Sequence, residues 1–224
     1  MMNFNFNISE LVFVVPELFL LAAISSILLF DLYVKEEFKK YTYHLSQAAL
    51  LVTGLLAFNL IGESATIFSG TFVLDTLGST FKVFIAGFSI IALVYSRQYL
   101  SVHGLLRNEY FILALMSILG MLVMVSGHSL LTLYLGLEIM SLSLYALIAT
   151  ARDRAFAIEA ALKYFVLGAI ASGLLLYGMS MIYGITGNLD IAQIASFASL
   201  ATLEPQETLI LNFGLVFLVI GVAF

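Results

Sequence analysis

Residues 133–147 read LYLGLEIMSLSLYAL, an apolar stretch with one carboxylate, Glu138, near its centre. The stretch lies within an apolar run over 130–149, and a helix that crosses a lipid bilayer needs about 20 such residues. The rest of the chain has a similar composition. Of its 224 residues, 62% are hydrophobic and only 10% are charged, against roughly a quarter charged in soluble domains. With a mean hydropathy of +1.09, the chain is expected to lie mostly in lipid.

Seven apolar runs are long enough to span a bilayer. Because the runs are apolar on all sides and lack the alternation of barrel strands, they predict an all-α, polytopic membrane protein with about seven transmembrane helices. In the longest connecting segment, the spacing of Ile191, Ile194 and Ala198 predicts a short surface helix, and Pro205 is expected to open the last span. The seven runs cover residues 11–30, 43–62, 77–95, 109–127, 130–149, 157–184 and 208–224.

Positive charges are distributed unevenly between the connecting loops. Loops 31–42, 96–108 and 150–156 carry seven Lys and Arg residues, whereas the intervening loops carry none. This distribution predicts that the basic loops face the cytoplasm and that the amino terminus lies on the outer, periplasmic side. The net charge of −5 is spread over loops and does not indicate a nucleic-acid partner. The absence of cysteine excludes disulfides, iron–sulfur clusters and thiolate metal sites in this chain.

Three ionisable residues lie well within the predicted spans, where a central charge costs about 2.5–3.5 kcal/mol. The first is Glu138, which has Tyr134, Ser141 and Tyr145 at helical spacing. We expect these side chains to form a polar stripe that faces protein or water rather than lipid. A functional carboxylate is the favoured interpretation of such a residue, and a structural carboxylate held by a neighbouring helix is the alternative.

The second is Lys163, which follows Glu159 by one helical turn, the favoured order for an i,i+4 ion pair. We expect the depths of Glu138 and Lys163 to differ by about 7–8 Å, so that they meet directly or through one water as a charge pair that holds or releases a proton. Alternatively, Lys163 extends its amine to the cytoplasmic interface beside Glu159. The small residues that follow allow another helix to approach closely; they are Gly168, Ala169, Ser172 and Gly173.

The third is Lys82, which lies near the outer end of the third run, seven residues after Asp75. We expect its amine either to reach the interface or to pair with Asp75, and a role in proton transfer is the weaker alternative. The chain has no nucleophile–base set, phosphate-binding loop, metal cluster or dinucleotide fingerprint. Any chemistry resident in it is therefore the movement of ions or protons, or belongs to a partner.

Four stretches together resemble the subunit N family of the bacterial proton-pumping NADH–quinone oxidoreductase, respiratory complex I. The first two distinguish this family from its sister antiporter-like subunits, whereas the motif around Glu138 is shared with them. The stretches are VPELFLLAAISSILLFDLY at 15–33, FSGTFVLDTLGSTFKVF at 68–84, LYLGLEIMSLSLYAL at 133–147 and EAALKYFVLGAIASGLLLYG at 159–178.

The resemblance implies the amino-terminal half of an antiporter-like fold of fourteen helices, with two inverted five-helix repeats that carry charges at the membrane midplane. In such a fold Glu138 matches the fifth-helix glutamate and Lys163 the sixth-helix lysine of the first repeat. The family's next lysine follows a pattern that matches GVAF, residues 221–224, where this chain ends. We therefore expect a fragment truncated within the seventh helix.

The resemblance also implies a function, namely a membrane-arm subunit of the inner (plasma) membrane that couples electron transfer from NADH to quinone to proton transfer through buried charges. It implies no redox chemistry or cofactor in this chain, since NADH, FMN, iron–sulfur clusters and quinone belong to other subunits. The expected partners are other membrane subunits of the complex and the lipid bilayer. The alternatives are a cation/proton antiporter or membrane-bound hydrogenase subunit of the same superfamily, and a static membrane scaffold.

Overall fold

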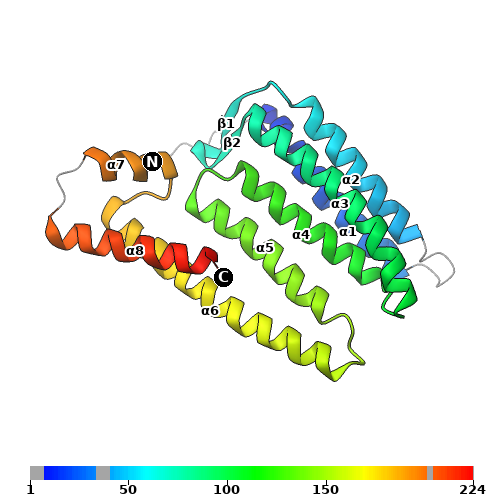
Figure 1. Ribbon diagram of the computed structural model, residues 1–224. Coiled ribbons are helices and arrows are strands. Elements are labelled where there is room, and N and C mark those ends of the chain that lie inside the picture. The colour runs from blue at the N-terminus through cyan, green and yellow to red at the C-terminus, as the bar shows by residue number, and fades with distance from the viewer. Residues whose placement is uncertain (1–7, 34–40, 201–203, 224) are drawn as a thin grey trace.

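The computed structural model of the chain describes residues 8–33, 41–200 and 204–223. Long helices lie side by side over most of its length, which confirms the predicted all-α membrane architecture (Figure 1). A 3-10 helix, η1 (Ile8–Val14), leads directly into α1. The helices are α1 (Val15–Tyr33), α2 (Tyr41–Asn59), α3 (Thr76–Val102), α4 (Asn108–Ser126), α5 (Leu130–Ile148), α6 (Ala155–Thr186), α7 (Ile191–Leu200) and α8 (Pro205–Ala223).

Six of the helices in the described part of the chain are long and apolar enough to cross a membrane. The remaining predicted run, 43–62, corresponds to α2, which has 19 residues but is more polar because its first two turns contain Thr42, His44, Ser46 and Gln47. Thr42 and Ser46 are buried in the bundle, whereas His44 is exposed, so only part of this polarity faces inward. The short helix α7 occupies the segment where a surface helix is expected, and α8 begins at Pro205.

The main hydrophobic core is built by α1, α2, α3 and α4. Helix α4 contributes half of the core residues, among them Leu115 and Leu122, which are fully buried, and it has the largest buried share of the six spans. Helix α5 packs along α4, and α6 lies beyond α5 (Figure 1). The carboxylate of Glu138 on α5 therefore lies at the α5–α6 interface, outside this core.

A small β-hairpin, which the hydropathy pattern does not predict, precedes α3. Strands β1 (Ala65–Ile67) and β2 (Phe72–Leu74) pair antiparallel, and Phe68 and Ser69 between them have positive φ angles. The strand end at Phe72 bridges to Gly127, and the next turn residue, His128, donates its backbone N–H to the carbonyl of Thr71. The amide of Leu130 in turn bonds to Leu189 O. These backbone bonds join the hairpin, the α4–α5 turn and the segment before α7 into one end of the bundle.

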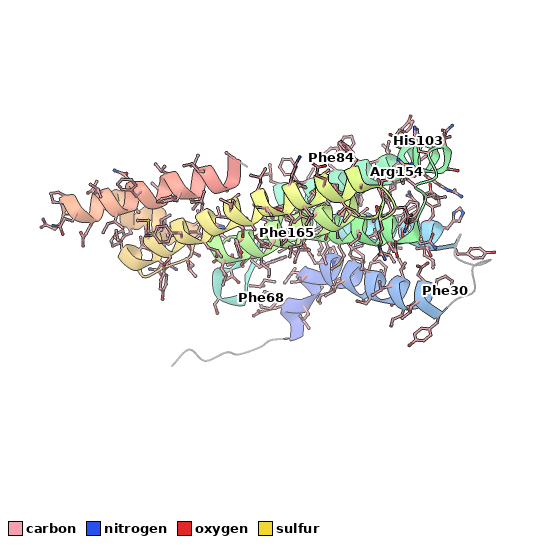
Figure 2. All side chains as sticks on the ribbon, turned by 90° about the horizontal axis from the view of Figure 1, so that it is seen from below. Phe30, Phe68, Phe84, His103, Arg154 and Phe165 are labelled. Atoms are coloured by element: carbon pink, nitrogen blue, oxygen red, sulfur yellow. The ribbon has the colours of Figure 1, made fainter. Side chains whose placement is uncertain are left out.

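The described basic loops meet at the other end of the bundle. Arg107 forms an ion pair with Asp153 at 2.6 Å, and Arg154 donates to the backbone carbonyl of His103. Figure 2 shows His103 and Arg154 next to each other there, far from Phe68 of the hairpin segment. The basic and the Lys/Arg-free loops are thus sorted to opposite ends, although which end faces the cytoplasm stays a prediction. Lys35, Lys39 and Lys40 lie outside the described residues.

Glycines allow α6 and α8 to approach to backbone contact. A methyl group on Gly178 of α6 would lie 2.6 Å from the carbonyl oxygen of Gly214 and 2.8 Å from the amide nitrogen of Leu218 on α8. Gly221 of α8 fits against Ala171 and Leu175 of α6 in the same way. Close contact of this kind is how membrane helices associate when lipid provides no hydrophobic driving force between them.

We predict that Gly178→Ala destabilises the protein and that Gly173→Ala does not. A Cβ at Gly178 meets backbone atoms that do not give way, whereas nothing lies within 4 Å of one at Gly173. In the matched control, alanine improves helix propensity by about 0.5–1 kcal/mol. Thermal unfolding of the full-length chain in detergent measures the difference, and equal midpoints for the two variants would contradict close α6–α8 packing.

Candidate functional site

Glu138 is held by a hydroxyl from the neighbouring helix. Helix α5 begins after Ser129, whose side chain caps it by accepting from Leu131 N, and Glu138 follows just over two turns later. Its Oε1 accepts a hydrogen bond from Ser172 Oγ on α6. The hydroxyl of Tyr134, one turn before Glu138, lies 2.9 Å from the same Ser172 Oγ. The polar stripe thus faces α6, and Tyr134, Ser172 and Glu138 form a continuous chain of hydrogen bonds.

Tyr145, at the end of the polar stripe, sets the register of α5 against α6. Tyr145 packs edge-on against the rings of Tyr164 and Phe165, with ring centroids 4.6 and 5.9 Å away. A Cβ at Gly168 would overlap the Tyr145 hydroxyl, so the small residue predicted to permit close approach receives this ring. The hydroxyl of Ser141 instead donates to the carbonyl of Leu137 on its own helix.

Lys163 lies at the basic-loop end of α6 and pairs with Glu159. Its Nζ is 2.5 Å from Glu159 Oε1, and the two side chains are 71% and 62% exposed. This is the alternative arrangement considered for Lys163 from the sequence. An exposed i,i+4 pair of this type contributes only about 0.3–0.5 kcal/mol to stability, so stability does not explain why a lysine stands there.

The structure shows no direct contact between Glu138 and Lys163, which is the first of the two arrangements expected for them, and an exchange through water stays a prediction. The residue of α6 that lies level with Glu138 is Ser172, nine positions after Lys163. At 1.5 Å per residue this offset is about 13 Å along the helix axis, nearly twice the 7–8 Å expected from the predicted helix ends. Lys163 instead lies level with the last turn of α5, beyond the ring of Tyr145.

Lys82 lies inside the bundle and pairs with Glu17 of α1. The Lys82 Nζ is 2.5 Å from Glu17 Oε1, and the side chains are only 1% and 5% exposed. The amine also lies 5.0 Å from the centroid of the Phe72 ring, a cation–π contact. The expectation of an interfacial amine or a pair with Asp75 is wrong, because Asp75 caps the start of α3 and accepts from Gly78 N at 2.6 Å.

Glu17 is a buried charge that sequence reasoning misses. The rule that selected the other three charges also applies to it, since Glu17 is a carboxylate inside the apolar run that begins at residue 11. Its position near the start of that run is ambiguous, because an acidic side chain in the first turn of a helix is common at an interface. Only its burial, at 4% exposure, identifies it as an intramembrane charge.

The described residues contain no group of three or more His, Asp or Glu side chains that would hold a metal ion. A hydrogen-bonded carboxyl group such as Glu138 is chemically able to bind and release a proton. A carboxylate hydrogen-bonded to a hydroxyl, with a second hydroxyl beyond it, provides both a proton acceptor and a route to it.

Known proteins share this sequence and this arrangement of helices. The family model for the transmembrane region of NADH:quinone oxidoreductases and Mrp antiporters matches residues 127–224, which include Glu138 and Lys163. NADH-quinone oxidoreductase subunit N of Ruthia magnifica subsp. Calyptogena magnifica is 66% identical over 226 aligned residues, which cover 100% of this chain and 47% of that protein. The chain is homologous to NADH-quinone oxidoreductase subunit N along its whole length. It spans about half the length of the curated relatives it matches.

Two solved structures have the same fold. A chain of respiratory complex I from Thermus thermophilus with bound aureothin gives a TM-score of 0.71 at 26% identity, covering 93% of this chain and 43% of that one. A chain of the membrane-bound sulfane sulfur reductase, an archaeal respiratory membrane complex, gives 0.78 at 25% identity, covering 95% and 44%. The fold is thus common to several membrane complexes, and it is sequence identity that singles out the subunit N family.

We predict that Glu17 and Lys82 behave as one energetic unit. Glu17→Met and Lys82→Met each leave one buried charge unpaired, so each is expected to lower the free energy of unfolding by about 3–5 kcal/mol. The double variant removes both charges and is expected to be less destabilised than either single variant. A double-mutant cycle on the full-length protein measures this coupling, and additive effects would contradict a direct ion pair.

Proposed function

We propose that the chain is part of a membrane-arm, proton-translocating subunit of NADH–quinone oxidoreductase in the inner membrane. The observation that carries the proposal is the hydrogen-bonded group of Glu138, Ser172 and Tyr134 at the α5–α6 interface, in a chain 66% identical to a subunit N. Electron transfer from NADH to quinone takes place elsewhere in the complex. The nicotinamide, flavin, iron–sulfur clusters and quinone are carried by other subunits, and other membrane-arm subunits are the partners.

Glu138 is the proton carrier in this proposal. As a carboxylate it accepts from Ser172 Oγ, and as a carboxylic acid it donates, so one proton is taken up and released at the same oxygen. The hydroxyls of Ser172 and Tyr134 orient the carboxyl group and extend the path by one hydrogen bond. Moving one charge against 100 mV takes about 2.3 kcal/mol, which the distant quinone chemistry has to supply.

Lys163 exchanges protons with Glu138 through water rather than by contact. The offset of about 13 Å along α6 is too long for the two side chains to bridge alone, and the Tyr145 ring lies between the two levels. Lys163 and Glu159 stand at the basic-loop end, where their exposure allows a proton to be collected and passed inward. A movement of the Tyr145 side chain is the natural gate for such a path.

A cation/proton antiporter or hydrogenase-type subunit is the second candidate, since the fold is shared with other membrane complexes. The two solved structures resemble this chain almost equally well, with TM-scores of 0.71 and 0.78, so the fold alone does not separate the two candidate functions. The sequence identity of 66% to a subunit N favours the first. Sodium-dependent exchange in vesicles without NADH is the result that would favour the second.

We predict that Glu138→Gln, introduced into the full-length subunit of an assembled complex, lowers the rate of proton translocation at least about tenfold. The amide keeps the size of the side chain and can still accept from Ser172, but it does not carry the proton. Glu63→Gln, at an exposed acid outside the helices, is the matched control. Proton uptake by vesicles is measured per NADH oxidised. Normal translocation by a normally assembled Glu138→Gln complex would rule out the carrier role.

We predict that Lys163→Met leaves assembly intact and reduces the proton yield. The exposed pair with Glu159 contributes at most about 1 kcal/mol to stability, so its loss should not unfold the subunit. Native gel analysis measures assembly, and vesicle acidification measures the yield. The reverse result, failed assembly with an unchanged yield per assembled complex, would instead support the scaffold hypothesis.

A further inference from the structure

A second group of buried polar side chains lies outside the α5–α6 interface, near the hairpin end of the bundle. It consists of Glu17 on α1, Ser79 and Lys82 on α3, and Ser126 on α4, here called the hairpin-end cluster. Their exposed fractions are 4%, 0%, 1% and 2%. The mechanism proposed for Glu138 uses none of these four residues.

The four side chains lie at the same end of the bundle, where three helices and the hairpin meet. Ser79 precedes Lys82 by three residues and so lies on the same face of α3. A methyl group on the neighbouring Gly78 would lie 3.5 Å from the Val125 side chain of α4, so the start of α3 lies close to the last turn of α4, which ends at Ser126. Phe72, whose ring lies under the Lys82 amine, bridges to Gly127, the residue after Ser126.

The hydrogen-bonding capacity of the cluster is largely unfilled. The Lys82 amine and Glu17 Oε1 form a close ion pair, and no further side chain among the described residues hydrogen-bonds to either group. The Ser79 and Ser126 hydroxyls have none either. They contrast with Ser46 on α2, equally buried, whose hydroxyl donates to Thr42 O at 2.8 Å.

Such a concentration of orphaned groups is costly if the site is dry. A buried polar group without a partner destabilises the folded state, and a charged group does so more strongly. An ammonium carries three donors and a carboxylate about four acceptor sites, so one ion contact satisfies only a small part of their capacity. Buried water typically makes about three hydrogen bonds to polar groups of this kind.

We propose that the hairpin-end cluster is a buried water-binding site, in which ordered water joins the Ser79 and Ser126 hydroxyls to the Lys82–Glu17 ion pair. The ligand class is water, because the donors and acceptors present are mixed and the cluster already balances its own charge. A metal cation is disfavoured by the Lys82 ammonium beside the only carboxylate, and an anion by Glu17. The proposal does not depend on proton translocation by the chain.

Replacing the Ser79 and Ser126 hydroxyls changes the unfolding midpoint differently in a hydrated cluster and in a dry one. In a dry cluster, Ser79→Ala and Ser126→Ala each remove an orphaned hydroxyl and should leave the protein unchanged or more stable. In a hydrated cluster the same changes remove a partner of the water and should lower the unfolding midpoint by about 2–4 °C each. Ser46→Ala removes a hydroxyl satisfied within its own helix and is the matched control.

Thermal unfolding of the full-length protein in detergent or lipid provides the first measurement, and a density map of the assembled complex that resolves buried water provides the second. The proposal expects lower midpoints for both cluster variants than for Ser46→Ala, and water density within hydrogen-bond distance of Ser79 Oγ, Ser126 Oγ and Lys82 Nζ. Midpoints at or above that of the control overturn it. A map that shows buried water elsewhere but none at these atoms also overturns it.

Discussion

The organisation of the bundle depends on one constraint: a polar group inside lipid needs a partner within the protein. The chain meets this requirement at two separate interfaces. Between α1 and α3 the partners are opposite charges, Glu17 and Lys82, whereas between α5 and α6 a carboxylate meets a hydroxyl, Glu138 with Ser172. Each contact fixes the rotation of both helices about their axes, because a turn of either would expose a charge to lipid.

The same constraint separates a stabilising charge from one that can react. The Glu17–Lys82 pair is compensated and enclosed, so removal of either charge leaves the other unpaired inside the bundle. Glu138 has no ion partner among the described residues and is held by a neutral hydroxyl instead. A neutral hydrogen bond positions the carboxyl group of Glu138 without a fixed counter-charge beside it. That difference makes Glu138 the better candidate to bind and release a proton.

Features that follow from local periodicity were accessible from the sequence, whereas those that depend on chain segments meeting in space were not. The stripe of Tyr134 and Glu138 needs only the helical repeat, and the apolar runs need only length. The partner of Lys82 lies in another helix, and the nearest acid in the sequence, Asp75, is used as a cap. The expected depth difference between Glu138 and Lys163 was too small because it assumed that the facing ends of α5 and α6 are level. The predicted ends lie within two residues of the observed ones, at Ile148 and Ala155, but the contact between Glu138 and Ser172 shows that the two helices are offset along their axes.

The contact between Glu17 and Lys82 also bears on how the chain is made. Helix α1 is synthesised before α2, the hairpin and α3, so Glu17 enters the membrane well before its partner exists. During that interval its carboxyl group has to be protonated, kept at the interface or shielded by the insertion machinery, since an unpaired charge is disfavoured in the bilayer. Insertion of α3 therefore supplies Lys82, the partner that Glu17 of α1 lacks until then, so the order in which the helices are synthesised affects how the bundle folds.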